Sequence, residues 1–185
     1  MTPCEVEEYR ALRATIRERG TTRVWVFTVG LIAWAGLAVA TAGLGGVPVA
    51  ALVPLIVLAG TFEAVFALHI GVERIGRYIQ VFYEEGATAS DTGPRASHQW
   101  EHAISAFGRG VPGGATDPLF AWIFATATLL NFTPVLLAEP VAVEVATLGA
   151  AHFAFLVRVA LAMRASKRQR AFELARFTEM KDRMV

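Results

Sequence analysis

Apolar residues follow one another without a charged residue in two long stretches of the chain. The first stretch covers residues 24–62 and the second covers residues 118–138. An uncharged apolar run of about 20 residues matches the hydrocarbon thickness of a bilayer, because each helical residue rises 1.5 Å. One helix over the first stretch would be about 58 Å long, which is too long for a single crossing. The glycine-rich segment 44–46 therefore predicts that this stretch folds into a helical hairpin.

The same pattern predicts four membrane-spanning helices. Their expected limits are residues 24–42, 48–68, 118–138 and 141–163. The second span has no clean end, because apolar residues keep a spacing of three and four into the charged segment that follows, to about residue 85. This spacing predicts a helix-packing stripe. The stripe consists of Val65, Leu68, Val72, Ile75, Ile79 and Phe82.

Polar segments flank the predicted spans. The first of them begins with a capping box, in which Thr2 and Glu5 satisfy each other's backbone N–H groups. It then continues as an amphipathic helix and is expected to end near Gly20. In chain order, the predicted polar segments are an amphipathic helix over 3–20, a linker over 86–96, a short helix over 97–107 and a C-terminal helix over 164–185.

Composition agrees with a membrane protein. Hydrophobic residues make up 55% of the chain and charged residues 18%, whereas a soluble domain carries about 25% charged residues. The expected fold class is all-α, a four-transmembrane-helix bundle of two helical hairpins. Amphipathic or cytoplasmic helices are expected at the N-terminus, between the hairpins and at the C-terminus. Together they form a single polytopic membrane domain over residues 1–185.

The 17 lysines and arginines fall on one side of the predicted hairpins. The two opposite connections, residues 43–47 and 139–140, contain none of them. The positive-inside rule then places both termini in the cytoplasm. The alanine-, arginine- and glycine-rich composition indicates a bacterial protein, so the expected location is the inner membrane. A basic cluster after the fourth span is expected to fix this topology and contact lipid headgroups. It consists of Arg164, Lys167, Arg168 and Arg170.

Four polar residues are expected inside the bilayer, where such groups are functional hypotheses by default. Glu63 and Arg158 lie about 22 and 25 Å below the outer ends of their spans, so they are predicted to pair. His152 is expected near the midplane, and Asn131 in the outer half of the third span. In one interpretation Glu63, His152 and Arg158 form a proton or ion path. In the other, which is favoured, the polar groups fix helix packing.

The segment HQWEH at 98–102 matches the H-x-x-E-H pattern of some zinc proteases. On a helix, His98 and His102 would lie one turn apart and could share a metal ion. A hydrolytic zinc site needs a third protein ligand, and nothing in the sequence specifies one. The favoured interpretation is a surface helix without metal, and no cofactor is expected.

Small residues recur at four-residue spacing on one face of three predicted spans, which allows close helix contact within the chain or between copies. These faces consist of Gly36 and Ala40, of Gly60 and Ala64, and of Ala146, Ala150 and Ala154. The leading expectation is therefore a non-enzymatic membrane scaffold or assembly component that is oligomeric through the stripe from Val65 to Phe82 and through the small-residue faces. Its expected partners are the lipid bilayer and further copies of the chain, not nucleic acid.

Two other functions stay open from the sequence. One is a subunit of an oligomeric ion or proton channel or small transporter, which would use Glu63, His152 and Arg158. Four spans rarely enclose a pathway alone, so this function also needs several copies. The other is a membrane metalloprotein that binds its metal through His98 and His102.

Overall fold

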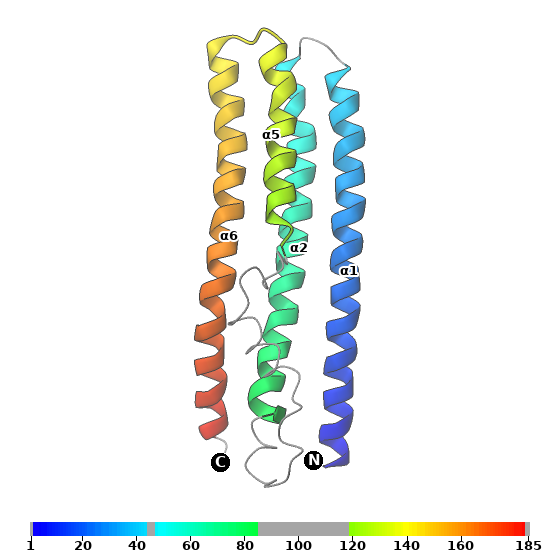
Figure 1. Cartoon of the computed structure of the whole chain (residues 1–185), viewed down its shortest axis with the longest axis vertical. Coiled ribbons are helices and arrows are strands. Elements are labelled where there is room, and N and C mark those ends of the chain that lie inside the picture. The colour runs from blue at the N-terminus through cyan, green and yellow to red at the C-terminus, as the bar shows by residue number, and fades with distance from the viewer. Residues whose placement is uncertain (1, 44–46, 85–118, 184–185) are drawn as a thin grey trace. The chain divides into compact units, whose positions relative to one another are not determined.

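The computed structural model describes residues 2–43, 47–84 and 119–183 (Figure 1). These residues contain helices and no strand, so the all-α class is confirmed for the described part of the chain. The predicted linker 86–96, the short helix 97–107, and with them His98 and His102, lie outside the described residues. The helices are α1 (Pro3–Ala42), η1 (Pro48–Ala51), α2 (Leu52–Ile79), the π-helical η2 (Gln80–Glu84), α5 (Ala121–Leu137) and α6 (Ala142–Asp182).

Three helical segments of the described chain are long and apolar enough to cross a membrane. They are α1, the segment Pro48–Tyr83 that contains α2, and α6. The fourth apolar helix, α5, has 17 residues and is about 25 Å long. The prediction of a membrane protein is therefore confirmed in part, since three helices of the described chain could span a bilayer.

Helix α1 starts as the sequence predicts, but it does not end where the sequence predicts. The Thr2 N–H donates to Glu5 Oε2 over 2.6 Å, and the Glu5 N–H donates to Thr2 Oγ1 over 3.3 Å, so the capping box is confirmed. The predicted end near Gly20 is wrong, because α1 continues to Ala42. A single glycine inside a helix costs only about 1 kcal/mol. Breaking the helix there would instead leave up to eight backbone groups without partners.

Residues 119 and 120 of the predicted third span are not helical either. Helix α5 begins at Ala121 and not at residue 118, because Phe120 adopts the left-handed conformation (φ 52°, ψ 32°). A residue in this region cannot continue a right-handed helix. At the other end, Glu139 also has a positive φ of 49° and separates α5 from α6. The Val141 N–H donates to Glu144 Oε2 over 3.0 Å and so caps α6, which runs unbroken through the predicted boundary at residue 163.

The described residues divide into two compact units, residues 2–20, 69–84 and 166–183 in the first and residues 21–43, 47–68 and 119–165 in the second. We call the first the charged unit and the second the apolar unit. Each unit contains part of α1, α2 and α6, whereas α5 belongs to the apolar unit alone.

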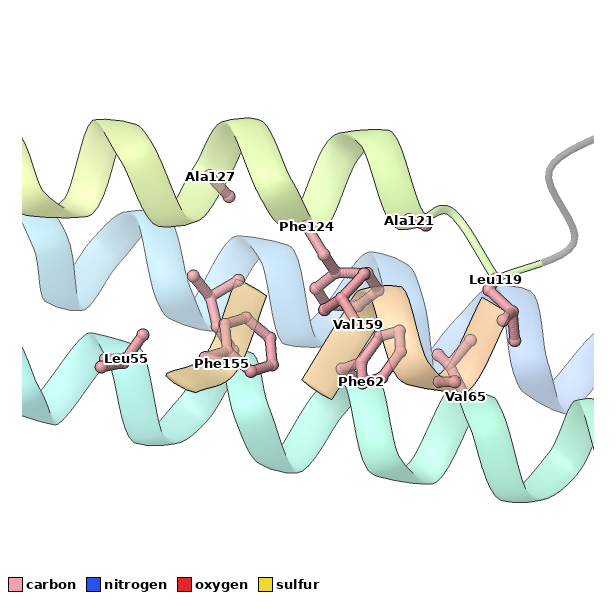
Figure 2. Packing of buried hydrophobic residues seen from close by; sticks show 11 residues of the cluster. Leu55, Phe62, Val65, Leu119, Ala121, Phe124, Ala127, Phe155 and Val159 are labelled. Atoms are coloured by element: carbon pink, nitrogen blue, oxygen red, sulfur yellow. The ribbon is translucent and has the colours of Figure 1, made fainter. Parts of the chain in front are cut away.

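Phenylalanine rings form the centre of the apolar unit. Phe62 of α2 packs edge to face against Phe124 of α5 and Phe155 of α6, with ring centroids 5.2 and 5.9 Å apart. Figure 2 shows these rings together with aliphatic side chains of the same three helices. Burying such large apolar side chains stabilises helix packing, and edge-to-face contact adds to it. The cluster consists of Leu55, Leu58, Phe62, Val65, Leu119, Ala121, Phe124, Ala127, Phe155, Val159 and Ala162.

Helix α1 has no fully buried residue, and its partly buried side chains pack against the edge of this cluster. At Gly30 it lies close to Thr61 of α2. A Cβ atom at position 30 would lie 2.2 Å from Thr61 Cγ2, so a larger residue does not fit there without movement. The sequence had not singled out Gly30.

Four of the six residues of the predicted packing stripe, which runs from α2 into η2, lie in the charged unit. Ile79 is fully buried within the chain, whereas Leu68, Val72, Ile75 and Phe82 are partly buried. Val65 and Leu68 lie in the apolar unit, and Val65 is also fully buried. The stripe therefore contributes to packing inside one chain.

Candidate functional site

Asn131 lies at the centre of a buried hydrogen-bond network in the apolar unit. Its Nδ2 group donates to the Ala51 carbonyl over 2.9 Å and to His152 Nε2 over 3.0 Å. Its Oδ1 accepts from the Trp34 indole N–H over 3.3 Å. One α5 side chain thereby connects to α1, η1 and α6. Asn131 and His152 are only 3% and 4% exposed, so water contributes little at this point.

The partners of His152 define which of its nitrogens carries the hydrogen. Its Nδ1 lies 2.8 Å from the Leu148 carbonyl, which can only accept, so Nδ1 carries the hydrogen. Nε2 is then the acceptor for Asn131, and the ring is neutral. The ring also packs against Phe132, with centroids 5.0 Å apart. Both nitrogens are therefore used within the chain, which is the arrangement expected of a histidine that fixes packing.

A small pocket opens beside this network. Its polar lining side chains are Asn131 and Thr41, and the rest of its lining is apolar. The Thr41 hydroxyl donates to the Leu37 carbonyl over 2.8 Å, and Asn131 is bonded as described above. Both polar side chains are thus already bonded within the chain itself.

Glu63 and Arg158 form the predicted ion pair. Arg158 Nη2 donates to Glu63 Oε2 over 2.7 Å, and the guanidinium carbon lies 5.0 Å from the centroid of the Phe66 ring. The two side chains are not in the core, since the Glu63 side chain is 48% exposed and that of Arg158 is 40% exposed. His152 contacts Asn131 and Leu148 instead. The structure thus separates the three residues of the predicted ion path into a surface pair and a core histidine.

The predicted small-residue faces point away from the core. All seven of their residues are exposed, and nothing lies within 4 Å of a Cβ atom built at Gly36 or Gly60. The close helix contact inside the chain occurs at Gly30 and Thr61 instead. The exposed residues are Gly36, Ala40, Gly60, Ala64, Ala146, Ala150 and Ala154.

A second polar cluster holds α2 and α6 together in the charged unit. Arg77 donates to Glu173 in an ion pair whose residues are 4% and 8% exposed. Arg77 Nη2 also lies 3.1 Å from Glu73 Oε2, and Arg74 Nε lies 3.1 Å from Glu173 Oε1. Gln169 Nε2 donates to Glu173 over 2.7 Å. The sequence had not pointed to Glu173, because its role depends on where the C-terminal part of α6 packs.

The surroundings of Glu173 lower the pKa of its carboxyl group. Burial alone raises this pKa, but hydrogen bonds from Gln169, Arg77 and Arg74 stabilise the ionised form and outweigh it. Burial also raises the pKa of Tyr78, and its hydrogen bond to Glu8 over 3.1 Å adds to the effect. These contacts connect α1 to α2 and α2 to α6 within the charged unit.

Two further contacts in the charged unit also join different helices. His69 Nε2 lies 3.0 Å from Ser166 Oγ, and Lys181 Nζ donates to the Val81 carbonyl over 2.6 Å. The second contact caps a carbonyl group at the π-helical end of the α2 segment. All members of the predicted basic cluster are exposed on α6, namely Arg164, Lys167, Arg168 and Arg170.

The polar side chains described above form hydrogen bonds and ion pairs within and between helices. Within residues 2–43, 47–84 and 119–183, no three histidine, cysteine, aspartate or glutamate side chains come together as metal ligands. The chain matches no known protein family, and no characterised protein or solved structure is significantly similar to it. The arrangement of these polar groups is therefore the basis for a functional proposal.

Proposed function

We propose that the chain is a non-enzymatic membrane scaffold or assembly component with four spans. In this proposal α1 pairs with α2 and α5 pairs with α6, as two helical hairpins in one bundle, and both termini are cytoplasmic. α5 would be the fourth span, because 17 residues lie at the short end of the range that crosses a bilayer. The one-sided distribution of lysine and arginine supports the orientation.

The Asn131 network is the observation that carries this proposal. A polar group without a partner is costly in hydrocarbon, and here the side-chain groups of Asn131 and His152 are matched within the chain. Interhelical hydrogen bonds of this kind contribute to helix association in membranes. A binding site for a polar substrate would instead need some of these groups to be available to the substrate. The network thus supports a role in holding helices together.

Reconstitution tests the proposal. Liposomes that contain the purified protein are expected to show no proton, sodium or potassium flux above that of empty liposomes. Gentle solubilisation of native membranes is expected to give complexes heavier than one 20.0 kDa chain. Flux above background would contradict the non-transport role, and a strictly single-chain mass in native membranes would contradict an assembly role.

A channel or transporter subunit is the second candidate, and the Glu63–Arg158 pair favours it. Ionisable groups in a membrane-spanning segment mark ion paths in many transporters. The half-exposed pair lies on a surface that other copies could complete into a pathway. In this case the wild-type protein conducts ions, and Glu63→Gln abolishes the flux without changing the mass of the complex.

A further inference from the structure

The Glu63–Arg158 pair lies on the outer surface of the apolar unit. Glu63 belongs to an exposed face of α2 with Ile56, Gly60 and Ala67, at spacings of four, three and four residues. This spacing puts the four residues on one side of the helix. Ile56 is 70% exposed, so the face continues without cover toward the outer end of α2.

The face of α6 that carries Arg158 also has small, exposed residues. Arg158 follows Ala150 and Ala154 at intervals of four residues, and both alanines are exposed. The ion pair therefore joins two neighbouring helix faces that otherwise carry small or apolar side chains. We call the surface around this pair the paired-charge face. It consists of Ile56, Gly60, Glu63, Ala67, Ala150, Ala154 and Arg158.

The depth of the pair in the proposed bilayer makes its exposure unfavourable. Glu63 lies about 22 Å along the helix from Pro48, whereas the hydrocarbon core is about 30 Å thick. Its neighbour Phe62 packs against Phe124, in the first turn of α5, which places the pair inside the inner leaflet. Charged side chains at such a depth are rare on a lipid-facing surface and normally face protein or water.

We propose that the paired-charge face is the contact between two copies of this chain, which close over the ion pair inside the membrane. A two-fold axis through the face brings Glu63 of one copy near Arg158 of the other and the reverse. The face is self-complementary because it carries one charge of each sign. The result is a cluster of two carboxylates and two guanidinium groups, in which every charge has an opposite neighbour in each chain.

Small residues make the required approach sterically feasible. Nothing lies within 4 Å of a Cβ atom at Gly60, so the backbone of α2 is uncovered next to Glu63. The exposed Ala150 and Ala154 leave the backbone of α6 nearly as accessible. Small residues at such spacing allow membrane helices to pack closely. The charges then define which face pairs, and the small residues define how near the copies come.

A matched pair of glycine substitutions tests the contact. Two differently tagged copies of the full chain are co-expressed, and the fraction of one tag that co-purifies with the other is measured. Gly60→Leu is expected to reduce this fraction about tenfold. Gly36→Leu is the control, because position 36 is equally open but lies on α1. Equal co-purification in both variants would overturn the proposed contact, and similar melting temperatures establish that each variant folds.

Charge reversal separates contact between copies from contact within a chain. Glu63→Arg gives a chain with two positive charges on the face, and Arg158→Glu gives a chain with two negative charges. Each variant alone is expected to lose self-association, whereas the two variants together are expected to co-purify at the wild-type level. Failure of the mixture to recover would show that the pair acts only within one chain, or that lipid headgroups and water cover it.

This dimer rests on the proposed membrane scaffold, but the two can fail separately. Complexes heavier than one chain that persist in Gly60→Leu would overturn the dimer contact and leave the scaffold standing. Glu63-dependent ion flux together with loss of co-purification in Gly60→Leu would overturn the scaffold and leave the contact standing. Wild-type copies with different tags that never co-purify would overturn the contact directly.

Discussion

The Arg77 guanidinium and the Glu173 carboxylate form a buried ion pair in the charged unit, although 96 positions separate them in the chain. Arg74, Glu73 and Gln169 complete the cluster around them. A buried charge is tolerated only when its partner is present, so each residue of the pair depends on the other.

Glu173→Gln is expected to destabilise the charged unit by about 3 to 5 kcal/mol, because it leaves the buried Arg77 without its main counter-charge. Unfolding in detergent, followed by far-UV circular dichroism, measures the change. Glu179→Gln is the matched control, since Glu179 lies on an exposed part of the same helix and pairs with Arg183 just past the helix end. The control is expected to change stability by about 0.5 kcal/mol or less. Equal effects of the two substitutions would contradict a special role of Glu173.

Acid is expected to remove the contribution of Glu173. Its pKa in the folded chain lies below the ordinary value of 4.5, so the unfolded chain takes up a proton first as the pH falls. The stabilisation is therefore complete above the ordinary pKa and disappears as the pH falls through the lowered one. The difference in melting temperature between wild type and Glu173→Gln should shrink over this interval. A difference that stays constant down to the lowest accessible pH would refute this linkage.

Gly30→Ala is expected to lower stability by about 1 to 3 kcal/mol, because the new methyl group would overlap the Thr61 side chain. Thr61→Ala in the same chain removes the two nearest atoms and is expected to recover part of the loss. Gly36→Ala is the control, since nothing lies near position 36, and it is expected to be neutral or to stabilise α1 by up to about 1 kcal/mol. Thermal melts of the four proteins in one detergent provide the comparison.

Asn131→Leu is expected to cost about 1 to 2 kcal/mol, because the Ala51 carbonyl, the Trp34 N–H and His152 Nε2 all lose their partner. Thr133→Val is a suitable control on the same helix, since the Thr133 hydroxyl is exposed and bonds only to the Leu129 carbonyl. Melting temperature and resistance to proteolysis would both report the difference. A variant at position 131 as stable as the control would argue against the network as a packing device.

Cysteine labelling tests the proposed orientation. Cys4 is the only natural cysteine, so Cys4→Ser gives a background without thiols. Gly43→Cys and Glu139→Cys are expected to react with an impermeant reagent added to intact cells. Met180→Cys is expected to react only after the membrane is opened. Equal reactivity of positions 43 and 180 in intact cells would contradict the four-span arrangement.

The sequence predicted those features that depend on neighbours along the chain or on depth alone. The capping box of Thr2 and Glu5 is local, and the pairing of Glu63 with Arg158 follows from equal helical rise. Both are present. The end of a helix at Gly20 was wrong, because a glycine weakens a helix without stopping it when the flanking residues favour continuation.

Features that depend on helix rotation and on distant packing could not be predicted. Spacing placed Gly36 and Gly60 on faces of small residues, but it could not say that these faces point outward while Gly30 contacts Thr61. Glu173 likewise became significant only when α6 was seen beside Arg77. The residues next to a single charged side chain in a basic helix do not indicate whether that side chain pairs in the core or on the surface.

The position of α1 at the edge of the core implies that tolerance to substitution differs along the chain. Because this helix has no fully buried residue, a saturation library should accept most apolar exchanges between residues 24 and 42. Tolerance should fall sharply at Gly30 and Trp34, where the helix meets Thr61 and Asn131. A variant-abundance profile of α1 should therefore show two narrow minima of tolerance to substitution, at Gly30 and Trp34, among positions that accept most exchanges. The corresponding profile of α2 should instead show a restrictive position at almost every turn.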